Sequence, residues 1–167
     1  YEEEELTEEE KEQEKNNKYF IRVNYEANVV NIYTQDEDGN FTKPYKAMVC
    51  STGSATPDGG TYKTSDKGKW GYMVGNVWAQ YYTRICGSIL FHSVPYTAKN
   101  NHSLEYWEYD KLGTTASAGC VRLTTKDAKW IYDNTIKYQE DLKRPITRND
   151  ISKEKVGFSS IVINRLY

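Results

Sequence analysis

The chain has 167 residues, 38% of them hydrophobic and 14% aromatic, so it can bury one sizeable core but is too short for two ordinary domains. Its formal charge of −2 is unevenly distributed, because residues 1–14 hold nine glutamates and one lysine, a net −8. The remaining 21 Lys and Arg and 15 Asp and Glu leave a net +6 on the rest of the chain. This modest positive charge favours anionic partners, and no nucleic-acid partner is expected.

The first 18 residues differ in composition from the rest. They are rich in glutamate and contain almost no apolar residue except Leu6, so residues 1–18 are predicted to form an acidic linker or a frayed helix. No charged start followed by an apolar stretch precedes the folded part, so we expect membrane attachment only through a segment that is not present here. Residues 19–167 are predicted to form one domain.

Hydrophobic alternation begins at Tyr19, with Ile21 and Val23 on the same face, which is typical of a strand. Further along, Ile89–His92 is an apolar run that predicts a buried strand ending in a histidine. A helix is predicted after Thr124, a good N-cap residue. The other predicted elements are strands over 29–34, 45–51 and 158–166, turns at 26–28 and 36–40, a turn-rich loop over 56–62 that leads into another strand, and a long, aromatic, lid-like loop over 95–115.

The segment Ser117–Leu123 contains the best candidate for a nucleophile. Cys120 follows Gly119, and a glycine at this point allows a tight turn on which a substrate can approach the sulfur and the backbone amides. A thiol must lose its proton to become a nucleophile, so a base or a positive field is needed nearby. His92 is the candidate base, and Arg122 is a candidate positive neighbour.

The other two cysteines lie in different settings. Cys50 is part of an apolar strand, and Cys86 follows Ile85, so neither has the small-residue turn of Cys120. They could pair as a disulfide, but we favour a buried, reduced pair because sequence does not fix their distance. Nothing in the sequence calls for a metal or an organic cofactor.

With these residues in place, the sequence resembles the L,D-transpeptidase catalytic domain family, which has the YkuD-like fold. Ser117-Ala118-Gly119-Cys120-Val121-Arg122 is similar to the family signature of Ser or Thr, His, Gly, Cys, an apolar residue, and Asn or Arg. The opening strands, the Ser51–Pro57 segment, the strand ending in His92-Ser93 and the helix over 127–133 follow in the same order. The resemblance covers roughly residues 19–166.

The resemblance implies a mainly β fold, a YkuD-like β-sandwich of mixed sheets with one or two short helices and a long lid loop before the cysteine. It also implies that Cys120 is the nucleophile and His92 the general base, with the Ser93 carbonyl fixing the imidazole tautomer. Arg122 would pair with a carboxylate of the substrate or of the protein. Further candidates for substrate binding are Ser117, Tyr82, Tyr106 and Trp107.

Two features depart from the family pattern. Ala118 stands where most members have a second histidine, a variant that resembles part of the Gram-positive branch. From His92 to Ser117 there are 24 intervening residues, which is longer than the usual gap and suggests an insertion in the lid. His102 lies at the more usual distance from Ser117, but it sits in a polar loop, and we therefore favour His92 as the base.

The implied activity is acyl transfer from a peptidoglycan tetrapeptide stem through a Cys120 thioester, with release of D-alanine and formation of a 3-3 cross-link. Such an enzyme would serve cell wall biogenesis and cell shape, would act at the cell wall or cell surface of a Gram-positive bacterium, and would be inhibited by carbapenems. The alternatives are an L,D-carboxypeptidase, a sortase-like transpeptidase and a non-catalytic wall-binding module. Sortases place threonine before the cysteine, whereas this chain has Gly119.

Overall fold

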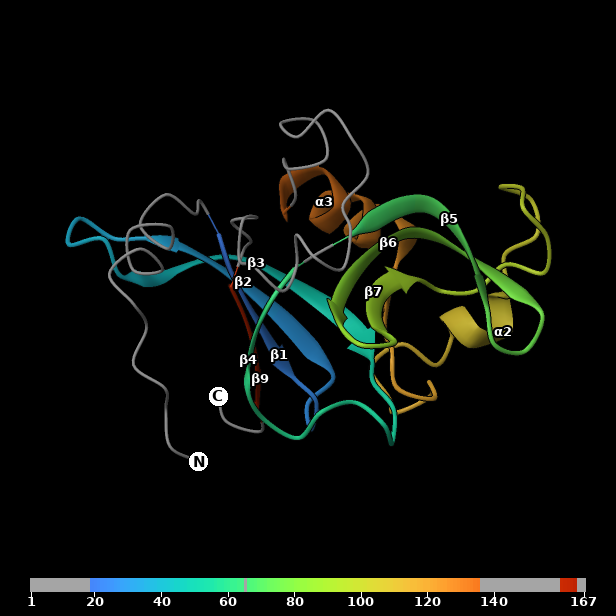
Figure 1. The fold of residues 1–167 in the computed structure, drawn as a ribbon, viewed down its shortest axis with the longest axis horizontal. Helices are drawn as coiled ribbons and strands as arrows, with labels where there is room; N and C mark the ends of the chain where they lie inside the picture. The colour runs from blue at the N-terminus through green and yellow to red at the C-terminus, as the bar shows by residue number, and fades with distance from the viewer. Residues whose placement is uncertain (1–18, 65, 136–159, 165–167) are drawn as a thin grey trace.

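The computed structural model of the chain describes residues 19–64, 66–135 and 160–164. The backbone of this part is mainly β with two helices, as the sequence predicts, while the predicted acidic linker over 1–18 lies outside the described residues. None of the helices described is long and apolar enough to cross a membrane. The elements in Figure 1 are β1 (Phe20–Asn24), β2 (Val29–Gln35), β3 (Phe41–Ser51), β4 (Thr61–Lys63), β5 (Lys67–Met73), β6 (Val77–Cys86), β7 (Ile89–Ser93), α2 (Tyr106–Tyr109), β8 (Val121–Leu123), α3 (Thr125–Thr135) and β9 (Ser160–Asn164).

The strands are hydrogen-bonded in the order β4-β9-β1-β2-β3-β8-β7-β6-β5. Most neighbours are antiparallel, whereas β1 with β9 and β7 with β8 are parallel, so the predicted mixed pairing is confirmed. Strand β3 joins the two halves, because it pairs with β2 along most of its length and with β8 only at Cys50 and Ser51. Figure 1 shows β1, β2 and β3 on one side of the molecule and β5, β6 and β7 on the other.

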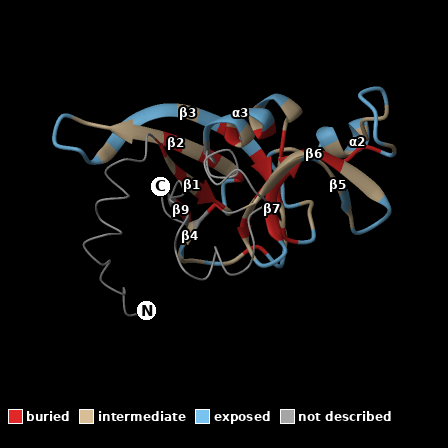
Figure 2. Ribbon diagram, turned by 45° about the horizontal axis from the view of Figure 1, so that its top comes forward, coloured by how far each residue is buried: buried red, intermediate tan, exposed pale blue. Residues whose placement is uncertain are grey.

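One hydrophobic core is shared by both halves and by α3, whose buried Ile131 contacts it. Helix α3 begins as predicted, because the Thr124 hydroxyl oxygen accepts a hydrogen bond from the Asp127 N–H at 3.2 Å. Strand β7 is buried along its whole length, which its apolar run predicts. Figure 2 shows the buried segments at the centre of the molecule and the exposed turns at its periphery.

The hairpin of β5 and β6 is the largest element that the sequence does not predict. Gly68 and Gly71 weaken the alternation in β5, and Tyr81, with a φ of 50°, breaks the alternation in β6. Gly68 has a packing reason, since a Cβ built there would lie 2.5 Å from the Tyr82 ring. The glycines of β5 therefore weaken the strand pattern in the sequence and at the same time make room for the Tyr82 ring.

The predicted lid loop over 95–115 is ordered and partly regular. It contains α2, and Tyr96 forms backbone bridges with Trp78 and with Leu104. Between these bridges the chain makes a compact excursion, which is closed by a hydrogen bond from the Thr97 N–H to the Ser103 carbonyl at 2.9 Å. The insertion that the long spacing before Ser117 suggests stays a prediction.

The turn between β1 and β2 carries Asn28, which is buried and has a left-handed φ of 52°. Its side-chain oxygen accepts hydrogen bonds from the Thr52 N–H at 2.9 Å and from the Thr52 hydroxyl at 2.7 Å. We expect Asn28→Ala to lower the free energy of unfolding by about 2–4 kcal/mol, because it removes both bonds and adds strain at positive φ. Asn28→Gly, which relieves the strain alone, should recover about 1 kcal/mol. Urea unfolding measures the free energy of unfolding of both variants. Equal losses in Asn28→Ala and Asn28→Gly would contradict the predicted strain.

Candidate active site

The parallel pairing of β7 with β8 brings the predicted site residues together. His92 is the register partner of Arg122, and Phe91 is that of Val121. Because side chains alternate along a strand, Cys120 and Arg122 share one face of the sheet with Leu90 and His92. The other face, with Phe91 and Val121, belongs to the hydrophobic core. The imidazole on β7 and the sulfur just before β8 therefore lie on the same face.

The turn before Cys120 is held in place by residues 53–56, the segment that follows β3. Ser117 forms a parallel bridge with Gly53, and the Ala55 N–H donates to the Ala118 carbonyl at 3.0 Å. The Thr56 hydroxyl donates to the Gly119 carbonyl at 2.6 Å. Gly53 permits this close approach, because a Cβ there would lie 2.1 Å from the Ser117 carbonyl oxygen. The position of the cysteine is thus fixed through contacts to the backbone of its own turn.

Cys120 is half-buried, and its thiol donates to the Ser88 carbonyl at 3.4 Å. Burial raises the pKa of this thiol, and the Leu90 N–H and the charges of Arg122 and Arg84 oppose that rise. All three cysteines are free, so a disulfide between Cys50 and Cys86 is not formed. Burial raises the pKa of Cys50 to about 12, which makes it unreactive, while Cys86 is only partly buried.

His92 is 4% exposed, and its Nδ1 lies 2.5 Å from the Ser93 carbonyl oxygen. A carbonyl can only accept, so Nδ1 carries the proton and Nε2 of the neutral ring is free to take one. Burial lowers the pKa of His92 to about 4, and the positive charge of Arg122 adds to the effect. The Ser93 hydroxyl, which accepts from the Gln80 N–H at 2.8 Å, ties this segment to the β5–β6 hairpin.

Arg122 pairs with a carboxylate of the protein. Its Nη1 donates to Glu108 of α2 at 2.8 Å and to the Ala116 carbonyl at 3.3 Å. The same Glu108 binds Lys111, and Lys111 and Arg122 together lower the pKa of its carboxyl group. The buried Nε of Arg122 has no partner among the described residues. Helix α2 is therefore attached to the site through Glu108.

The backbone next to the sulfur offers two N–H groups. In the part of the chain that the structure describes, the amides of Gly119 and Cys120 donate to no acceptor. The Ser117 hydroxyl, by contrast, donates to the Cys120 carbonyl at 2.5 Å, so this predicted substrate-binding group is used within the turn. Two free N–H groups beside a nucleophile are the arrangement that stabilises an oxyanion.

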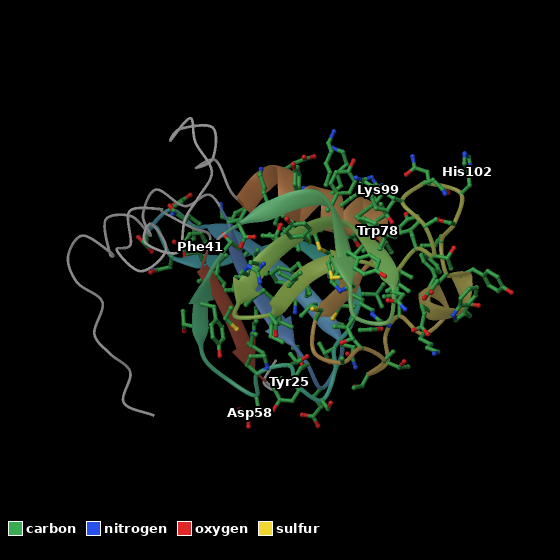
Figure 3. All side chains as sticks on the ribbon, turned by 45° about the vertical axis from the view of Figure 1, so that its right-hand side comes forward. Tyr25, Phe41, Asp58, Trp78, Lys99 and His102 are labelled. Atoms are coloured by element: carbon green, nitrogen blue, oxygen red, sulfur yellow. The ribbon has the colours of Figure 1, made fainter. Side chains whose placement is uncertain are left out.

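The remaining predicted residues lie at different distances from this centre. Tyr82 is on β6 and packs on the backbone of Gly68. Tyr106 and Trp107 are exposed on α2 and contact each other edge to face, with ring centroids 5.1 Å apart. His102 is exposed at the outer end of its loop, whereas Lys99 lies near Trp78 (Figure 3).

Sequence analysis did not identify Asn28, Gly53, Thr56 or Glu108, all of which support the site. Gly53 and Thr56 lie in the segment on which the family resemblance partly rests, but their role depends on contacts with residues more than 60 positions later. Within residues 19–64, 66–135 and 160–164, no group of three or more His, Cys, Asp and Glu side chains could hold a metal ion.

Comparison with known proteins identifies the family. A profile of the YkuD L,D-transpeptidase catalytic domain matches residues 18–148. The chain is 44% identical over 85 residues to YciB of Bacillus subtilis (strain 168), which is provisionally named an L,D-transpeptidase, and the match covers 48% of this chain and 42% of YciB. The chain thus spans less than half the length of that relative.

Solved structures share the fold. An L,D-transpeptidase from Mycobacterium smegmatis superposes with a TM-score of 0.57 at 18% identity, covering 88% of this chain and 58% of that one. The L,D-transpeptidase LdtMt1 in complex with imipenem superposes with a TM-score of 0.56 at 16% identity, covering 87% of this chain and 58% of that one. At these identities the likeness establishes the fold, and the predicted mainly β architecture with mixed strands is confirmed.

The low pKa of His92 predicts a pH-dependent stability. The unfolded state takes up a proton near pH 6.5 and the folded state only near pH 4, so the stabilisation is complete above pH 6.5 and is lost as pH falls through this window. The loss should reach about 3 kcal/mol, from about 1.4 kcal/mol per pH unit. Denaturant unfolding at pH 7, 6, 5 and 4.5 gives the free energy of unfolding at each pH. This free energy should fall less steeply with decreasing pH for His92→Gln than for the wild type. His102→Gln, at an exposed position, is the control and should keep the wild-type slope.

Gly53→Ala should displace the turn that carries Cys120. The added Cβ meets the Ser117 carbonyl, so we expect a loss of about 1–3 kcal/mol in the free energy of unfolding. The rate of Cys120 alkylation by iodoacetamide, followed by peptide mass spectrometry, should change as well. The matched control is Gly59→Ala, because a Cβ at Gly59 meets nothing within 4 Å. Equal effects of the two substitutions would contradict the proposed support of the turn.

Proposed function

Because the chain belongs to the L,D-transpeptidase catalytic domain family, we propose that it cross-links peptidoglycan by acyl transfer through Cys120. The observation that carries the proposal is the common face shared by the Cys120 thiol and the His92 imidazole, next to two unused backbone N–H groups. A nucleophile, a base with a free Nε2 and an oxyanion site are the parts that thioester chemistry requires.

In the first half-reaction, His92 Nε2 takes the proton of the Cys120 thiol, and the sulfur attacks the carbonyl of the L,D bond before the terminal D-alanine. The N–H groups of Gly119 and Cys120 stabilise the oxyanion. The imidazolium then gives its proton to the leaving nitrogen, the C–N bond breaks, D-alanine departs and a thioester remains. The Ser93 carbonyl keeps the ring in the required tautomer throughout.

In the second half-reaction, the side-chain amine on the third residue of a neighbouring stem attacks the thioester. Its proton passes to His92 and from there to the departing sulfur, which restores the thiol and yields a 3-3 cross-link. Water in place of the amine would make the protein an L,D-carboxypeptidase. Because burial raises the pKa of Cys120 and lowers that of His92, the resting pair is thiol and neutral imidazole. Proton transfer therefore accompanies substrate binding.

The fold relative that holds imipenem supports a further part of the proposal, namely that carbapenems acylate Cys120. A peptidoglycan substrate also implies action at the cell wall or cell surface, and we propose this location in a Gram-positive bacterium. Gly119 before the cysteine and membership of the family favour this activity over a sortase-like one. The proposal assigns no task to an imidazole at position 118, since Ala118 occupies it.

The test is incubation with disaccharide-tetrapeptide followed by mass spectrometry. Cross-linked dimer and free D-alanine are expected with the wild type, and Cys120→Ala should form neither. His92→Gln should lower kcat/KM by about 10²–10⁴-fold, the usual contribution of general acid–base catalysis. His102→Gln, outside the site, should retain wild-type activity.

Each product pattern has a distinct meaning. Tripeptide without dimer would indicate hydrolysis, and the absence of both products would favour a non-catalytic wall-binding module. Intact-mass measurement with imipenem gives an independent readout, because an adduct on the wild type that is lost in Cys120→Ala identifies the acylated sulfur. An adduct that persists in Cys120→Ala would refute the assignment of the nucleophile.

A further inference from the structure

A second arginine, besides Arg122, contributes positive charge at the Cys120 thiol. Arg84, on β6, forms a two-point ion pair with Asp66, with its Nε 2.5 Å from Oδ1 and its Nη2 3.3 Å from Oδ2. Its Nη1 donates to the Gly87 carbonyl in the turn between β6 and β7. The guanidinium is therefore held in one orientation by a carboxylate and a backbone carbonyl.

The turn between β6 and β7 places this guanidinium next to Cys120. The Gly87 carbonyl binds Arg84 and the next carbonyl, that of Ser88, binds the Cys120 thiol. Arg84 is also the register partner of Leu90, whose N–H faces the sulfur. The two side chains thus donate to consecutive carbonyl groups of one turn. The positive charge of Arg84 also lowers the pKa of the Cys120 thiol.

The two arginines near the sulfur differ in their availability. The Arg122 side chain is 18% exposed and is bound to Glu108 and to a backbone carbonyl. Arg84 and Asp66 are 32% and 34% exposed, so their ion pair borders solvent. Because solvent reaches this pair and screens it, a substrate carboxylate can compete with Asp66 for the guanidinium. Arg84 is the guanidinium that an incoming anion can reach.

Building on the proposed acyl transfer, we propose that Arg84 binds the terminal carboxylate of the donor stem and thereby selects donors whose scissile bond is the last one in the chain. In such a donor, the carboxylate is attached to the same carbon as the scissile nitrogen, so it must lie close to the sulfur when the bond is attacked. The planar fork of a guanidinium matches a carboxylate at two points. In a longer stem, the carboxylate lies one residue farther away and loses this partner.

The experiment compares two tetrapeptide donors that share their sugars and first three residues but end in D-alanine or in D-alaninamide. Release of the terminal residue gives kcat/KM for the wild type, Arg84→Gln, Arg84→Lys and Asp66→Asn. The wild type should prefer the acid by about 10- to 100-fold, the factor expected for hydrogen bonds to a charged group. Arg84→Gln should lose this preference, mainly because kcat/KM for the acid donor falls. Arg84→Lys should keep part of the preference.

Asp66→Asn distinguishes binding of the substrate carboxylate by Arg84 from the orientation of Arg84 by Asp66. It removes the ion pair and keeps the guanidinium, so the acid preference should persist even where overall activity falls. Free D-alanine should also inhibit the wild type competitively and D-alaninamide should not, which tests the inference without any variant that must fold.

Several results would overturn the inference. These are equal use of both donors by the wild type, equal losses on both donors in Arg84→Gln, and equal inhibition by D-alanine and its amide. In each of these cases the proposed function would stand, because the wild type still releases the terminal residue. Failure of the wild type to release it from either donor would refute the proposed function as well.

Discussion

The parallel hydrogen bonding between β7 and β8 determines where every group of the candidate site lies. Its register sets His92 opposite Arg122 and leaves Cys120 at the point where β8 begins. A shift by one residue would turn the histidine into the core and the core residue Phe91 toward the sulfur, because side chains alternate between the two faces of a strand. The burial of all five residues of β7 and the packing of α3 on Val121 and its neighbours oppose such a shift.

Burial shifts the pKa values of the two candidate catalytic groups, Cys120 and His92, in opposite directions. It favours the neutral thiol of Cys120 and the neutral ring of His92, so the free site holds no internal ion pair. The positive charges of Arg122 and Arg84 favour the thiolate, and that of Arg122 also disfavours the imidazolium. In the proposed mechanism, the proton therefore rests on sulfur in the free site and moves to His92 in the first half-reaction.

Local patterns in the sequence predict the strands that have one buried face and the helix that follows Thr124, because alternation and N-capping are local properties. They also single out Cys120 and His92, since a glycine before a cysteine and a histidine at the end of an apolar strand are visible without a structure. The choice of His92 over His102 as the base is consistent with the exposed position of His102, but the catalytic roles stay predictions.

What the sequence does not reveal depends on contacts between distant residues. Gly68 reads as a strand breaker until the Tyr82 ring is seen to lie on it, and Glu108 reads as a surface carboxylate until α2 brings it to Arg122. The supporting Asn28 reads as an ordinary turn residue. In each case the partner is many positions away, and neither spacing nor composition identifies it.

The support of the cysteine turn has a consequence for the order in which the protein assembles. Asn28 reaches Thr52 across 24 positions and Thr115 across 87, and Thr56 reaches Gly119 across 63. Contacts of such long sequence separation carry a loop-closure entropy that must be met before they are rewarded, which slows folding. The sulfur therefore acquires its native surroundings only when both ends of this network have joined. The chemistry of Cys120 therefore depends on contacts between segments that lie far apart in the chain.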